Sequence, residues 1–137
     1  MADRVPPPET GLTVAVTGPT GTFGAGLVPL LLAEERVSRV VGIARRPFDP
    51  AAHGWAAMTY RRGDVRDPAA LTEAFAGADV VVHLAWALIP DREPEVLHAV
   101  NIEGTRRVLA AAGAAGVPHV VHMSSICLLY TSPSPRD

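Results

Sequence analysis

Short runs rich in apolar residues recur along the chain and predict strands. They lie at 12–16, 39–44, 58–62, 79–85 and 117–123. Their lengths are typical of strands, and the continuous run Val80-Val81-Val82-His83-Leu84 is typical of a strand buried on both faces of a parallel sheet.

Residues at helical spacing separate these runs. After the first run, four apolar side chains recur with the helical period: Phe23, Leu27, Leu30 and Leu31. Pro29 lies inside this predicted helix and removes a backbone hydrogen bond, which costs about 3 kcal/mol unless the helix bends. The sequence offers no explanation for that proline.

Two further helices are predicted. Asp67 as N-cap and Pro68 at the first helical position mark the start of one, and Gly77 marks its end. Its buried face is expected to carry Leu71, Ala74 and Phe75. The other is expected from about Glu93 to Ala112, with four side chains facing inward: Val96, Val100, Val108 and Leu109.

This alternation of strands and helices predicts right-handed βαβ units and a parallel sheet. The fold class is therefore α/β, with an expected strand order of 3-2-1-4-5. The length of 137 residues allows one domain at most.

Composition narrows the class of protein. The formal net charge of −2 argues against nucleic acid or an anionic membrane surface as partner, and no apolar stretch is long enough to cross a membrane. Residues 1–11 lack an apolar signal core and are expected to form a disordered arm, so a cytoplasmic protein is predicted. The single cysteine, Cys127, rules out a disulfide scaffold and a cysteine-based zinc site.

The last eleven residues, 127–137, are expected to differ in origin from the rest. Their sequence is similar to the translation of a transposon end plus adapter used in preparing sequencing libraries, and they contain no Ala, Val or Gly. We therefore expect a non-native tail, excluded from the fold. The alternative is a natural Ser/Pro-rich terminus.

A glycine-rich turn, Thr17-Gly18-Pro19-Thr20-Gly21-Thr22-Phe23-Gly24, follows the first strand. Such a turn presents free backbone N–H groups and the positive end of a helix to a phosphate. Gly18 permits the tight turn, Gly21 leaves room for a pyrophosphate, and Gly24 allows close packing of helix and strand. The alternative is a strand–turn–helix junction without a ligand.

Four more motifs follow in order: Asp64-Val65, His83-Leu84-Ala85-Trp86, Asn101-Ile102-Glu103-Gly104-Thr105 and Ser124-Ser125. With the glycine-rich turn, they make residues 12 to 125 resemble the extended short-chain dehydrogenase/reductase family, of the NAD(P)-dependent epimerase/dehydratase type. The resemblance implies a Rossmann-type doubly wound parallel sheet over 12–126, truncated here after the fifth strand.

The resemblance also implies a set of cofactor-binding residues. Asp64 would accept a hydrogen bond from the adenine amine and the Val65 N–H would bind a ring nitrogen, the alternative for Asp64 being a locally satisfied turn. Residues 84–86 would line the cofactor, with Trp86 in place of the family's usual small residue. The full set is Gly18, Thr20, Gly21, Thr22, Phe23, Gly24, Arg45, Arg46, Asp64, Val65, Leu84, Ala85, Trp86 and Asn101.

Catalysis would rest on Ser125, which would hydrogen-bond the reacting oxygen. In the family a Tyr-x-x-x-Lys pair then moves the proton, but this chain contains no lysine, so the fragment is expected to be inactive. Asn101 would organise the backbone near the active site. The alternative is that Asn101 lies at the surface and that Gly104 serves only close packing. His83 is expected to be a hydrogen-bonded core residue rather than an acid–base.

Arg45 and Arg46 lie where NAD-selective sites place an acid for the ribose 2′-hydroxyl. Two guanidinium groups there favour NADP over NAD, because they can pair with a 2′-phosphate. The alternative is that both face solvent.

These features predict an NAD(P)-dependent oxidoreductase or epimerase/dehydratase. It would act on a carbinol or carbonyl of a small molecule such as a sugar nucleotide or steroid-like alcohol, and the intact protein is expected to be a homodimer. The alternative is a non-catalytic dinucleotide-binding module that senses redox state.

Overall fold

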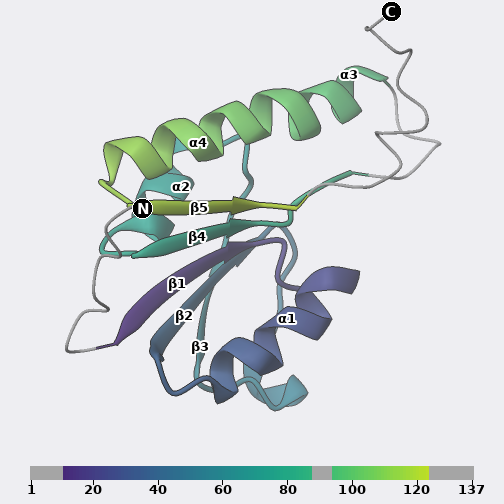
Figure 1. Ribbon diagram of the computed structural model, residues 1–137. Coiled ribbons are helices and arrows are strands. Elements are labelled where there is room, and N and C mark those ends of the chain that lie inside the picture. The colour runs from purple at the N-terminus through teal and green to yellow at the C-terminus, as the bar shows by residue number, and fades with distance from the viewer. Residues whose placement is uncertain (1–10, 88–93, 124–137) are drawn as a thin grey trace, which may run out of the picture.

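A five-stranded parallel sheet forms the centre of the molecule in the computed structural model, which describes residues 11–87 and 94–123 (Figure 1). The strand order is β3-β2-β1-β4-β5, as predicted. The strands are β1 (Leu12–Thr17), β2 (Val37–Ala44), β3 (Met58–Arg62), β4 (Val80–His83) and β5 (His119–His122).

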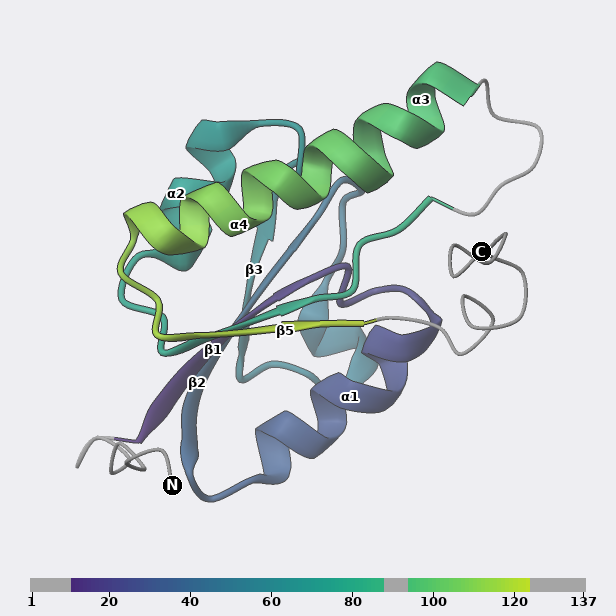
Figure 2. The same ribbon diagram turned by 45° about the horizontal axis from the view of Figure 1, so that its top comes forward.

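Helices connect the strands and cover the sheet on both sides. They are α1 (Thr22–Ala33), the short 3-10 helix η1 (Pro50–His53), α2 (Pro68–Phe75), α3 (Pro94–His98), the π-helical segment η2 (Ala99–Glu103) and α4 (Gly104–Ala114). Helix α1 lies on one face of the sheet, while α4, with α3 continuing its line, lies on the other face beside α2 (Figures 1 and 2).

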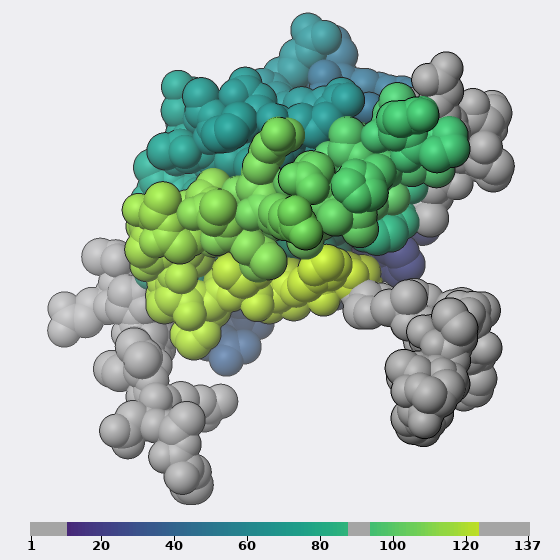
Figure 3. All heavy atoms as spheres, turned by 90° about the horizontal axis from the view of Figure 1, so that it is seen from above, coloured from purple at the N-terminus to yellow at the C-terminus, as the bar shows by residue number. Residues whose placement is uncertain are grey.

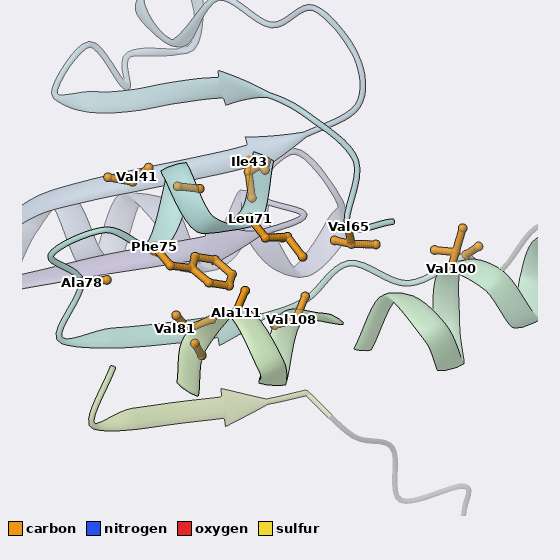
Figure 4. Packing of buried hydrophobic residues seen from close by; sticks show 14 residues of the cluster. Val41, Ile43, Val65, Leu71, Phe75, Ala78, Val81, Val100, Val108 and Ala111 are labelled. Carbon is orange, nitrogen blue, oxygen red and sulfur yellow. The ribbon is translucent and has the colours of Figure 1, made fainter. Parts of the chain in front are cut away.

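The alternation of strand side chains divides the core in two. On the side of α2 and α4, the fully buried Leu71 and Phe75 pack with Val108 against the sheet (Figure 4). Burying side chains of this size contributes about 1.5–3 kcal/mol each. On the other side, Val28 of α1 packs over Val16 and its neighbours in the sheet.

The predicted caps of α2 are confirmed. Asp67 is its N-cap and accepts a hydrogen bond from the Ala69 N–H at 3.0 Å, and Pro68 is the first helical residue. Gly77, with φ of +74°, follows its end in a conformation that favours glycine.

The predicted helix over 93–112 is interrupted, and one of its predicted core residues is wrong. Leu109 is 49% exposed. The buried line of α4 runs through Gly104, Val108, Ala111 and Ala112, which places Leu109 about 100° away around the helix.

Helix α1 continues through Pro29. Both Pro29 and Ala25, whose carbonyl the proline leaves without a helical donor, lie on the exposed side, where water can satisfy that carbonyl. Of the apolar residues that predicted the helix, Phe23 and Leu30 are exposed, because the buried side is centred on Gly24 and Val28.

Strand β5 lies at the edge of the sheet and pairs with β4. Figure 3 shows this strand at the surface beside α4. Of the predicted segments, the tail at 127–137, Ser125 and all of the arm at 1–11 except Gly11 lie outside the described residues. Among the helices that are described, none is long and apolar enough to cross a membrane.

Candidate functional site

A cavity of about 250 Å³ opens where the connections leave the carboxyl ends of the central strands. Strands β1 and β4 are neighbours in the sheet but their following segments diverge, which is where α/β folds bind ligands. The lining residues are Gly18, Thr20, Gly21, Ile43, Ala44, Arg45, Arg46, Gly63, Val65, Leu84, Ala85, Trp86, Ala87 and Val100.

The glycine-rich turn forms one wall of this cavity. Gly18 has φ of +71°, and a Cβ there would lie 2.9 Å from the Ala85 nitrogen, so both conformation and space require glycine. The Gly18 N–H donates to the Ile43 carbonyl at 3.1 Å, which ties the turn to β2.

Gly21 is the N-cap of α1, and its surroundings are open. Its φ of −80° suits any residue, and an added Cβ would meet only the Gly18 carbonyl oxygen, at 3.6 Å. The first amides of a helix have no partner inside it, so the start of α1 presents N–H donors beside the cavity.

The other predicted residues of the turn lie behind or beside the cavity. Thr22 and Phe23 are exposed on the first turn of α1 and do not line it. Gly24 is buried, and a Cβ there would overlap the Pro19 carbonyl. The close approach at Gly24 is therefore within the turn, rather than between helix and strand as expected.

Arg45 and Arg46 line the cavity at the end of β2. Strand β3 holds their backbone: Arg62 Nε donates to the Arg45 carbonyl at 3.0 Å, and the Tyr60 hydroxyl donates to the Arg46 carbonyl. Burial raises the pKa of Tyr60, so this hydroxyl keeps its proton. No carboxylate of the described residues forms an ion pair with either arginine side chain.

Asp64 is adjacent to the lining residues Gly63 and Val65 but is itself occupied by Arg66. The guanidinium donates from Nε to Oδ1 at 3.0 Å and from Nη2 to Oδ2 at 2.7 Å. These hydrogen bonds lower the pKa of Asp64. An adenine amine at this carboxylate would share it with Arg66.

The segment Leu84–Ala87, which we call the β4 wall, forms the opposite side. Trp86 is 49% exposed, and the other three residues are half-buried or buried. Asn101, on η2, accepts from the Ala87 N–H at 2.7 Å and donates to the Ala87 carbonyl at 2.9 Å. Asn101 thus acts on the backbone of the wall and does not itself line the cavity.

His83 is 2% exposed and directly precedes this wall in the chain. Its Nδ1 is 2.6 Å from Thr17 Oγ1, and its Nε2 is 2.9 Å from Thr105 Oγ1. Burial, with a smaller effect of the neighbouring His122, lowers the pKa of His83 to about 4, so the ring is neutral at pH 7. The hydrogen-bonded core position predicted for His83 is confirmed.

Several lining residues were missed by the sequence analysis. Gly63 had a signal, because a glycine directly after β3 indicates a close approach: a Cβ there would lie 2.9 Å from Ala70 Cβ. Ile43 is predicted only as part of its strand, and Ala44 only as the neighbour of the Arg45–Arg46 pair. Ala87 and Val100 carry no local signal.

Across the described parts of the chain, no group of three or more His, Cys, Asp or Glu side chains could hold a metal ion. Ser125, the predicted catalytic residue, lies outside the residues that the structure describes.

Fold and site together define a Rossmann-type domain, with a glycine-rich turn and a cavity at the point where the strand order reverses. Residues 14–136 match the model of the NAD dependent epimerase/dehydratase family, and the chain belongs to that family.

Known relatives and solved structures agree with this family. The chain is 38% identical over 123 residues to sterol demethylase protein B of Methylococcus capsulatus, covering 89% of this chain and 37% of that protein. It is 38% identical to L-arabinose 1-dehydrogenase (NAD(P)(+)) of Haloferax volcanii, covering 82% and 40%. The chain thus spans well under half the length of these relatives.

Among solved structures, a short-chain dehydrogenase/reductase superfamily protein from Agrobacterium tumefaciens with bound NAD matches with a TM-score of 0.69 and 35% identity, over 82% of this chain and 32% of that one. Uronate dehydrogenase from the same organism matches with a TM-score of 0.70 and 28% identity, over 85% and 41%.

Proposed function

We propose that this chain is the cofactor-binding part of an NAD(P)-dependent oxidoreductase or epimerase/dehydratase. The intact protein would act on a carbinol or carbonyl of a small molecule, such as a sugar nucleotide or a steroid-like alcohol. The observation that carries the proposal is the cavity between the glycine-rich turn, the Arg45–Arg46 pair and the β4 wall.

The residues present fit a nicotinamide dinucleotide. At Gly18 a side chain would collide with the backbone of Ala85, and at Gly21 a side chain would project into open space beside the cavity. With glycine at both positions, that space is open to a phosphate next to the N–H groups at the start of α1. Bound there, the nicotinamide would supply a hydride acceptor or donor. The relatives named for NAD(P) or solved with NAD support the same cofactor.

We propose NADP as the preferred form. Arg45 and Arg46 are exposed, line the cavity and form no ion pair among the described residues, although the charge of Arg45 acts on Asp64, so a 2′-phosphate would find two guanidinium groups able to bind it. Asp64 remains the proposed acceptor for the adenine amine, with Val65 beside it.

The proposed chemistry needs more than this chain contains. Ser125 would hydrogen-bond the reacting oxygen, but a Tyr-x-x-x-Lys pair cannot be built from a sequence without lysine. We therefore propose that the 137-residue chain binds the dinucleotide and does not turn over a substrate. The second candidate is a non-catalytic dinucleotide-binding module that senses redox state; it shares the cavity and needs no Tyr-x-x-x-Lys pair.

The test is a calorimetric titration of the chain with NADP and NAD. We expect Gly21→Asp to abolish binding, because its carboxylate would project beside the phosphate cradle and repel the pyrophosphate. Folding should be preserved, since Gly21 has an ordinary φ and Asp is a good N-cap residue.

Gly26→Asp is the matched control. Gly26 lies on the same helix with nothing within 4 Å of an added Cβ, so the variant carries the same charge away from the cavity. Binding should survive in Gly26→Asp. An unchanged dissociation constant in Gly21→Asp would refute the site.

A further inference from the structure

One continuous set of hydrogen bonds holds the β4 wall at both ends. At its start, Thr17 Oγ1 accepts from the Ala85 amide at 3.2 Å and, at 3.1 Å, from the Leu84 amide, which the Thr17 carbonyl also binds at 3.0 Å. At its end, Asn101 binds both backbone groups of Ala87. His83 joins the two ends. It contacts Thr17 on one side and Thr105 on the other, and the Thr105 hydroxyl binds the Asn101 carbonyl.

The direction of these hydrogen bonds follows from the one at Thr105. Its hydroxyl donates to the Asn101 carbonyl at 2.7 Å, so its oxygen can only accept from His83, and the ring proton must be on Nε2. The bare Nδ1 then accepts from the Thr17 hydroxyl. In this arrangement every donor of the set has an acceptor.

No other protonation state of His83 satisfies the same groups. A proton on Nδ1 would point at Thr17 Oγ1, which already accepts from two amides. The Thr17 hydroxyl would then lose its acceptor in a buried place, which is unfavourable. His122 of β5 is the titratable group that acts on His83 from a packed element, with the ring centroids 5.2 Å apart.

We propose that His83, as its Nε2–H tautomer between Thr17 and Thr105, is a positioning residue that presets the β4 wall for the dinucleotide. It touches no ligand and acts through the backbone of Leu84–Ala87. This inference rests on the proposed function for the identity of the ligand, while the hydrogen-bond set itself can be tested without one.

Thr105→Val tests the proposal, because valine keeps the shape of threonine and removes the acceptor for His83 and the donor to Asn101. We expect the Nε2–H signature in nitrogen NMR of the imidazole to change, and hydrogen exchange of the Ala85 and Ala87 amides to accelerate. The dissociation constant for NADP should rise about tenfold. Thr105→Ser should restore all three.

His83→Asn is the second variant. Its side-chain oxygen can take the place of Nδ1 opposite Thr17, but it cannot reach Thr105, so only the Ala87 end of the wall should loosen. His98→Asn, at an exposed site on α3, is the control and should change nothing.

Wild-type exchange and affinity in Thr105→Val would overturn the proposal. Failure of Thr105→Ser to restore them would also overturn it, because the loss would then reflect packing. If the wild-type chain binds no NADP, the proposed function fails, and the tautomer and exchange measurements still decide the role of His83.

Discussion

Two exposed arginine side chains set the cofactor preference that we propose. Their backbone is held by Tyr60 and Arg62 of β3, so removing the side chains should leave the wall of the cavity in place. Arg45→Ala combined with Arg46→Ala should weaken NADP by roughly 1.5–3 kcal/mol, the typical contribution of a charge-assisted hydrogen bond.

Binding of NAD should change little in that variant, because NAD has no 2′-phosphate. Calorimetric titration with both dinucleotides measures the difference. Arg39→Ala, which removes an exposed charge of β2 away from the cavity, is the control. Equal losses for both dinucleotides would mean that the pair does not recognise the 2′ position.

His83 also makes the stability of the fold depend on pH. Its pKa falls from 6.5 in the unfolded chain to about 4 in the folded one, so the unfolded state binds the proton first. The contribution of His83 to the free energy of unfolding is therefore complete above pH 6.5. It is lost as the pH falls towards 4, by up to roughly 3 kcal/mol.

Urea unfolding at a series of pH values between about 7 and 4.5 measures this effect. His83→Asn should flatten the curve in that range. Asp64 does not interfere, because its pKa is lowered by Arg66 and its contribution is lost only below its ordinary value of 3.8. Parallel curves for the wild type and the variant would contradict the prediction.

At the scale of single elements, two glycines of α4 serve different purposes. A Cβ at Gly104 would lie 2.7 Å from Val65 Cγ2, whereas a Cβ at Gly113 would meet nothing within 4 Å. Figure 4 shows Val65 near the start of this helical region, opposite Val100. The close contact is thus between α4 and the segment after β3, and it positions a lining residue of the cavity.

Gly104→Ala should destabilise the protein and Gly113→Ala should stabilise it. Alanine improves helix propensity by about 1 kcal/mol at either position, but overpacking against buried Val65 costs about 1–3 kcal/mol. Free energies of unfolding from urea titrations compare the two variants. If Gly104→Ala were as stabilising as Gly113→Ala, the contact with Val65 would not constrain the helix.

At the scale of the whole molecule, β5 is the exposed edge of the sheet. Val121 is 52% exposed there, and among the described strands β5 pairs only with β4. An apolar edge strand is a template for pairing with a second copy. We expect the 137-residue chain to self-associate with increasing concentration.

Val121→Lys should reduce that association, because a charge on an edge strand opposes edge-to-edge pairing. Sedimentation velocity over a range of concentrations measures it. Ile102→Lys, at a residue of η2 that is 43% exposed, adds the same charge away from the edge and is the control. A wild-type chain that stays monomeric throughout would contradict the prediction.

Local chemistry was enough to predict the five strands, helices α1 and α2, and their succession along the chain. The cap at Asp67-Pro68, the positive φ at Gly77 and the alternation of strands with helices depend on residues close together in the chain. The glycine-rich turn belongs to the same group, because the conformation of Gly18 follows from its immediate neighbours and its place after a strand.

Tertiary structure alone decided which side chains meet. Thr17 and His83 are 66 residues apart in sequence, and their hydrogen bond exists because β1 and β4 pair in register. The exposure of Leu109 and the π-helical turn that brings Asn101 to Ala87 depend likewise on how a helix is rotated and seated against the sheet. Helical periodicity shows which residues share one face of a helix. Packing against the sheet decides which face of that helix is buried.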